Sequence, residues 1–210
     1  MRTTLSRYKF KRLARESLRN SLRLHSDAIL LYENSSYPSA FQLAVLALEE
    51  LAKAKWVSHY CYTSITNEGF SDADFEQPWL ALLYSHTEKQ YAFLAREVFD
   101  YSPKLVKFVK SKKLELKKQQ SIYVSLDRMK NKIDVTGRIS IPERIKDKNE
   151  FLEIFNSVFI NVECFGVEEV DSVINSEEHQ FLFTWPHKTG LKSRHFLKQH
   201  IAIVQKDSSG

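Results

Sequence analysis

The chain has 210 residues, of which 43% are hydrophobic and 27% are charged. This length is enough to bury the core of one ordinary domain, and the composition excludes a wholly disordered chain. Only five glycines and five prolines are present, too few for the turns of a sandwich or barrel of many short strands. The composition therefore predicts a mainly α-helical protein.

The two cysteines, Cys61 and Cys164, exclude a dense disulfide framework, and no zinc-ligand spacing of Cys and His occurs. The basic N-terminus lacks the apolar stretch of a signal peptide. The longest apolar run, Leu43 to Leu48, is far shorter than the roughly 20 residues that cross a bilayer. We therefore expect a cytoplasmic protein with no integral membrane association, no metal and no cofactor.

The net charge of +5 conceals two strongly basic segments. Residues 1–25 contain eight Arg or Lys and one acidic residue, and residues 104–118 contain seven Lys and one Glu. The rest of the chain is acidic. Both segments are candidate surfaces for an anionic partner such as RNA.

Residues 8–34 have the periodicity of a helix with two faces. An apolar stripe and an arginine stripe both recur at helical spacing. The apolar stripe is Leu18, Leu22, His25 and Ile29, and the arginine stripe is Arg12, Arg15, Arg19 and Arg23. The arginine stripe has three interpretations that the sequence leaves open: a solvated face, an RNA-binding face, or a membrane-surface face.

A second helix, about residues 38–65, is apolar on all sides up to Leu48, as expected of a central helix in a bundle. Glu49, Glu50 and Lys53 follow directly. Burying carboxylates beside a lysine is costly unless the charges are paired, so they are either a structural ion pair or part of a polar site.

A third helix is predicted over residues 77–99, with His86 and Lys89 one turn apart. If it packs antiparallel to the second helix, these side chains complete a site with Glu50 and Lys53. The competing interpretation of His86 is a satisfied histidine in the core.

A lysine-rich helix is predicted over residues 104–119, with Lys110, Lys113 and Lys117 facing outward as candidate RNA-binding residues. A short β-hairpin follows, pairing Lys132 to Val135 with Arg138 to Ile141. Helices are expected again over residues 147–175 and 193–205. The predicted domain organisation is one domain over residues 1–210, with a bundle core, a β-hairpin segment, C-terminal helices and a disordered tail at 1–120, 121–145, 146–205 and 206–210.

Three phrases in this order carry a family resemblance: DAILLYENSSYPSAFQLAVLALEELAKA from Asp27, SHTEK from Ser85, and KQQSIYVSLD from Lys118. The chain resembles the AbiV-type abortive infection proteins of bacteria, a branch of the HEPN-like superfamily. The resemblance implies an antiparallel helical bundle and importance for five polar side chains and a tyrosine, namely Glu49, Glu50, Lys53, His86, Lys89 and Tyr123. The chain departs from the family's Tyr-Val-Asp pattern, because Ser125 and Leu126 precede Asp127.

The resemblance also implies a homodimer and either metal-independent RNA cleavage or a non-catalytic binding bundle. The cleaving branch uses an Arg four to six residues before a His. In such a pair the His transfers protons and the Arg stabilises the charged phosphorane. Arg19 with His25 and Arg194 with His200 both fit the spacing. We prefer Arg194 and His200, because His25 belongs to the apolar stripe.

The sequence thus supports a first hypothesis of a phage-defence effector that acts on RNA or translation after activation during infection. Its candidate catalytic residues are Glu50, Lys53, His86, Lys89, Arg194 and His200. The alternative is a non-enzymatic dimeric module that captures a phage or host protein. A lipid-surface protein that uses the arginine stripe is the third hypothesis.

Overall fold

The computed structural model describes residues 4–66, 69–90, 107, 109–126, 128–129, 132–133 and 135–142. These residues are mainly helical, as the composition predicted. By contacts the chain forms two compact units, Met1–Asn175 and Ser176–Gly210. The described residues all belong to the first unit, so the single-domain organisation stays a prediction. The expected helices at 147–175 and 193–205 and the tail at 206–210 lie outside the described residues.

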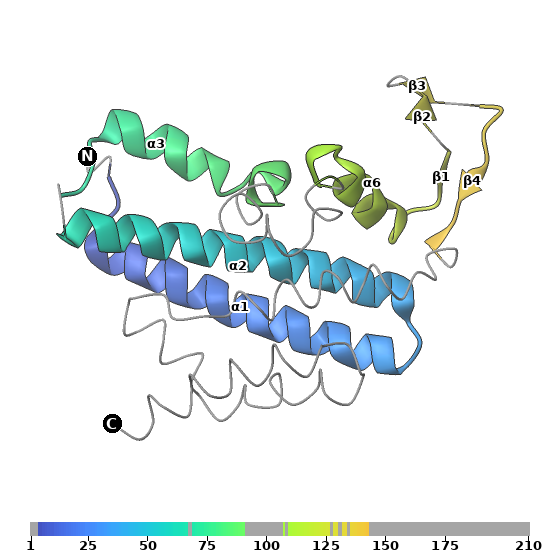
Figure 1. The fold of residues 1–210 in the computed structure, drawn as a ribbon, viewed down its shortest axis with the longest axis horizontal. Helices are drawn as coiled ribbons and strands as arrows, with labels where there is room; N and C mark the ends of the chain where they lie inside the picture. Colours follow the sequence, from blue (N-terminus) through green and yellow to red (C-terminus); the bar gives the residue numbers. More distant parts are fainter. Residues whose placement is uncertain are drawn as a thin grey trace. The chain divides into compact units, whose positions relative to one another are not determined.

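The two longest described helices are α1 (Arg7–Glu33) and α2 (Tyr37–Thr66), within a residue of the predicted bounds. The helices run antiparallel, side by side along most of their length (Figure 1). Ser6 begins α1, because its side chain accepts a hydrogen bond from the backbone N–H of Lys9 at 3.3 Å. Ser35 has a φ of 63°, and this left-handed residue lets the chain reverse within the short connection.

The interface between α1 and α2 is built from small and apolar side chains. The predicted apolar stripe of α1 is confirmed, because Leu18, Leu22, His25 and Ile29 are all buried. Ser21 Oγ donates a hydrogen bond of 2.7 Å to the carbonyl of Ala47 across the interface. Small residues on both helices allow this close approach and are buried: Ala14, Ser17, Ser21 and Ala28 on α1, and Ala40, Ala44 and Ala47 on α2.

An aromatic cluster holds α3 (Ala73–Leu82) against the ends of α1 and α2. Trp79 of α3 stacks on Tyr60 of α2 with ring centroids 4.5 Å apart. Tyr60 in turn lies 5.1 Å from the ring of Phe10 on α1. These ring contacts hold α3, and with it the start of the segment that carries His86, against the helix pair.

The single helix predicted over residues 77–99 is wrong within the described residues. Helix α3 starts earlier, where Asp72 accepts a hydrogen bond from the N–H of Phe75, and ends at Leu82. Residues 83–85 are not helical, and residues 86–90 are helical again. The cause is a capping sequence, since Ser85 Oγ accepts a 3.4 Å hydrogen bond from the N–H of Glu88. Residues 86–90 are therefore a helical segment separate from α3.

The lysine-rich helix predicted over 104–119 is also interrupted. A turn at Ser111 and Lys112 precedes α6 (Lys113–Gln120), and Lys112 has a φ of 58°. Val109 before the turn and Leu114 after it are both buried. The turn lets both apolar side chains reach the core, whereas on one straight helix residues five positions apart point to different sides. Near the end of α6, Ser121 Oγ donates to Gln42 Oε1 of α2 at 3.2 Å.

The β-hairpin insertion is present, but its strand pairing differs from the prediction. Strand β2 (Arg128–Met129) pairs with β3 (Lys132–Ile133), and β1 (Ser125–Leu126) pairs outside them with β4 (Ile139–Ser140), all antiparallel. The predicted pairing of Lys132 to Val135 with Arg138 to Ile141 is wrong. Only two residues separate β2 from β3, and a two-residue loop is the commonest hairpin connection. Because β3 is paired with β2, β4 pairs with β1 instead.

Candidate functional site

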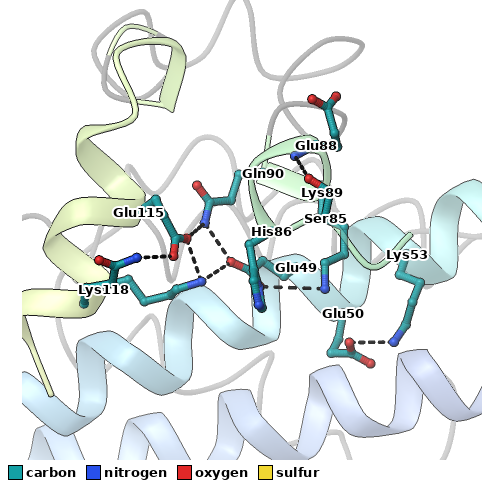
Figure 2. Close-up of polar contacts among 11 residues, drawn as sticks. Glu49, Glu50, Lys53, Ser85, His86, Glu88, Lys89, Gln90, Glu115 and Lys118 are labelled. Carbon is teal, nitrogen blue, oxygen red and sulfur yellow. Dashed lines mark hydrogen bonds and ion pairs between the residues drawn. The ribbon is translucent and has the colours of Figure 1, made fainter. Parts of the chain in front are cut away.

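A buried carboxylate on α2 organises a polar cluster between three segments of the chain. The side chain of Glu49 is 1% exposed, and it faces residues 86–90 and α6 rather than α1 (Figure 2). We call its group of eight side chains the Glu49 cluster. Helix α2 supplies Glu49, Glu50 and Lys53, the segment after α3 supplies His86, Lys89 and Gln90, and α6 supplies Glu115 and Lys118.

His86 is the most exposed member of the Glu49 cluster. Its Nδ1 lies 2.5 Å from Glu49 Oε2, and its side chain is 53% exposed. Because a carboxylate accepts, Nδ1 carries the proton in the neutral imidazole and Nε2 keeps a free lone pair. A histidine oriented by a buried carboxylate in this way is suited to transfer a proton at Nε2.

The other oxygen of Glu49 is bound from α6 and from Gln90. Lys118 Nζ donates to Glu49 Oε1 at 2.8 Å, and Gln90 Nε2 donates to the same atom at 2.7 Å. Both donors also bind Glu115 Oε2, at 2.7 Å and 2.9 Å respectively. Burial by itself raises the pKa of Glu115, but the hydrogen bond and charge of Lys118 outweigh it, so the pKa lies below its usual value.

Lys89 lies beside the same carboxylate, with Nζ 3.8 Å from Glu49 Oε2 and the side chain 7% exposed. Burial lowers the pKa of Lys89, and the nearby charges of Glu49 and Glu50 only partly restore it. The ammonium group is therefore a stronger acid than that of a surface lysine. The charges of a neighbouring ion pair also act on Lys89. In that pair, Lys53 Nζ donates to Glu50 Oε1 at 2.7 Å.

Two of the predicted site residues thus form a pair of their own. The sequence expected Glu50 and Lys53 to join His86 directly, but in the structure Glu49 contacts His86. Glu50 and Lys53 are each 16% exposed and lie one residue and one turn further along α2 (Figure 2). The four candidate catalytic residues that lie in the described part of the chain all belong to the Glu49 cluster: Glu50, Lys53, His86 and Lys89.

The cluster balances its own charge. Its three carboxylates are matched by three lysines, so with a neutral His86 the formal charges cancel. Protonation of His86 leaves a surplus positive charge at the solvent-exposed end. Within the described ranges no group of three or more His, Cys, Asp or Glu side chains is arranged to hold a metal ion.

The arginine stripe of α1 lies on an exposed face, but most of its charge is paired locally. Arg15 and Arg19 both bind Glu16, at 2.9 Å and 3.4 Å, and Arg23 binds Asp27 at 3.0 Å. Arg12 makes no ion pair with any described residue. The stripe therefore offers a phosphate backbone less free charge than its sequence suggests.

The lysines predicted to bind RNA lie around α6. Lys110 and Lys113 are exposed, and the ammonium of Lys117 lies 6.0 Å from the ring centre of Phe41 on α2. Arg194 and His200, the preferred Arg and His pair, lie outside the described residues and remain predictions. His25 is 1% exposed, and burial lowers its pKa to about 3, so it is a neutral core residue at pH 7.

Sequence reasoning from the residues themselves missed the centre of the cluster. The sequence draws attention to Glu49 beside Glu50 and Lys53 but does not place it among the candidate catalytic residues, and it does not select Gln90, Glu115 or Lys118 as site residues. Two signals were available. The capping sequence at Ser85 shows that His86 starts a new helical segment, and Glu115 and Lys118 are three residues apart on one helical face.

The antiparallel helices and the short antiparallel strands are consistent with a helical fold of the HEPN-like class, and the polar site of this chain is built on a buried carboxylate. The family model HEPN_AbiV, described as AbiV, matches residues 9–160, and the chain belongs to this AbiV family. Comparison with curated proteins and with solved structures found no match. Membership indicates a role in abortive infection, a defence against phage. Among the described residues, no helix has the length and apolarity needed to cross a membrane.

Proposed function

We propose that this AbiV-family protein is an abortive infection effector that acts on RNA, with His86 as its acid-base group. The observation that carries the proposal is the 2.5 Å contact between His86 Nδ1 and the buried Glu49 carboxylate, with His86 53% exposed. A histidine with only a packing role has no need of a buried carboxylate at one ring nitrogen while about half of its side chain is exposed.

RNA cleavage without a metal uses the 2′-hydroxyl of the substrate as the nucleophile. In the proposed step Nε2 of His86 takes the proton of that hydroxyl, the 2′-oxygen bonds to phosphorus, and the bond from phosphorus to the 5′-oxygen breaks. Water protonates the leaving 5′-oxygen, and His86 returns its proton to solvent. Glu49 stabilises the imidazolium that forms, as the buried carboxylate of a catalytic triad does.

The neighbouring lysines have a supporting role in this proposal. Lys89 and Lys118 hold the Glu49 carboxylate in place from two sides, at 3.8 Å and 2.8 Å. Exposed lysines around α6, including Lys110 and Lys113, supply charge for the phosphate backbone. Arg194 is retained as a candidate for stabilising the phosphorane, and His200 is retained as a candidate for proton transfer. A homodimer is part of the proposal because the Arg and His of the cleaving HEPN-like branch serve two protomers.

The test measures cleavage of a fluorescent single-stranded RNA by the purified full-length protein in EDTA, together with protection of phage-infected cells. His86→Ala is expected to lower cleavage at least 100-fold and to remove protection. The matched control is His59→Ala, an exposed histidine elsewhere on α2. His200→Ala is tested in parallel. Cleavage unchanged in both His86→Ala and His200→Ala contradicts the catalytic assignment.

The second candidate function is a non-enzymatic module that captures a phage or host protein. The observation in its favour is that the charges of the Glu49 cluster balance one another. A purely structural network, which only holds three segments of the chain in place, also requires such a balance. Pull-down from infected and uninfected cells separates the two functions. One specific protein partner, with no RNA enrichment and no cleavage, favours this second function.

A further inference from the structure

A groove between α1 and α3 shares no lining residue with the Glu49 cluster. Its volume is about 610 Å³, and it lies between the first turns of α1 and the second half of α3. Most of its wall is apolar, from side chains that include Leu13, Leu80 and Tyr84. A concave site of this size with mainly apolar walls and a few polar groups is typical of sites for small molecules.

The polar groups at the groove carry unbalanced positive charge. Lys9 and Arg12 line it, and neither makes an ion pair with a described residue. Glu16 also lines the groove, but its carboxylate is shared by Arg15 and Arg19, which lie 2.9 Å and 3.4 Å away. The charge left for a ligand at the groove is therefore that of Lys9 and Arg12.

These two properties define one class of ligand. An apolar body displaces water from the walls, and an anionic group meets the guanidinium of Arg12, whose planar donors match a carboxylate or a sulfonate. We propose that the groove binds a small amphipathic anion, a molecule with an apolar body and one acidic group. The proposal is independent of RNA cleavage at His86.

The experiment titrates the full-length protein with anilinonaphthalene sulfonate, whose naphthalene and sulfonate have the required chemistry, and follows its fluorescence. One saturable site is expected. Octanoate is expected to displace the probe at least tenfold more effectively than octyltrimethylammonium, which has the same chain and the opposite charge. Absence of a saturable site, or equal displacement by both competitors, overturns the proposal.

Variants assign the binding to the groove. Arg12→Gln is expected to raise the dissociation constant of the probe about tenfold. Arg23→Gln is the matched control on the same helix, since Arg23 is bound to Asp27 and does not line the groove. Ala81→Trp fills the groove from an exposed position and is expected to abolish saturable binding. Arg12→Glu provides a second variant if Ala81→Trp does not fold. Equal losses in Arg12→Gln and Arg23→Gln, or unchanged binding in the groove-filling variant, overturn the assignment.

Discussion

Helix α2 is held on one face by apolar packing against α1 and on another by the charges of the Glu49 cluster (Figure 2). Toward α1, buried alanines and leucines make contacts that depend on shape and area. At Glu49, each donor must meet an oxygen at hydrogen-bond distance, so a small displacement is costly. The first face sets the helix pair, and the second fixes the positions of residues 86–90 and α6.

The largest effect is expected from removing the centre of the charged face. Glu49→Ala leaves Lys118, 6% exposed, without its interhelical carboxylate, and we expect the free energy of unfolding to fall by about 4 kcal/mol. Urea denaturation measures it. In a double-mutant cycle with Lys118→Met, the loss is expected to shrink markedly, because the buried ammonium that kept only Glu115 as its partner is gone. A loss from Glu49→Ala that stays the same in the Lys118→Met background contradicts this account.

Removing buried apolar area from α2 is expected to be slightly less costly than removing Glu49. Leu48 is fully buried, and Leu48→Ala is expected to lower the free energy of unfolding by about 3 kcal/mol through lost burial and a cavity. The same urea measurement applies. The comparison is sharpened by salt: 0.5 M NaCl is expected to leave the Leu48→Ala loss unchanged. If the Leu48→Ala loss changes with salt, the distinction between apolar packing and charge pairing in α2 is contradicted.

Acid is expected to weaken the apolar face through His25. Its pKa is about 3 in the folded protein, whereas it is about 6.5 in an unfolded chain. Between these pH values the unfolded state binds the proton and the folded state does not. Stability therefore falls as the pH is lowered from about 6.5 toward 3, by about 1 kcal/mol per pH unit.

The contribution of His25 is isolated by comparing the wild type with His25→Leu in urea denaturation at several pH values. The variant is expected to lose this part of the acid dependence and to retain the part that comes from Glu115, whose lowered pKa also costs stability in acid. Identical pH profiles contradict the assignment to His25.

The smallest effect is expected at the turn that starts the segment with His86. Ser85→Ala removes a hydrogen bond of 3.4 Å from the N–H of Glu88, with a loss of about 0.5 kcal/mol in the free energy of unfolding. Ser85→Asp keeps an acceptor and is the control. If Ser85→Ala matches the wild type in thermal unfolding, other contacts start this segment.

Much of the fold was predictable from the sequence because α1 and α2 carry long, uninterrupted periodic patterns. Their bounds and the buried stripe around Leu22 follow from helical spacing and from the polar break between the helices. The breaks after Leu82 and at Lys112 were not predicted, because periodicity averages over them. One is set by a local cap, and the other by two apolar side chains that both need burial.

By itself the sequence determined a mainly helical chain, the pair α1 and α2, and a set of charged residues beside an apolar helix. Only the tertiary structure decided that Glu49, rather than Glu50, contacts His86, and that Lys118, 69 positions away, binds the same carboxylate. Only the tertiary structure showed that three of the four stripe arginines pair with two carboxylates of their own helix. The physical reason is that spacing fixes which face of a helix a residue occupies, whereas the partner of a charge depends on where distant segments pack.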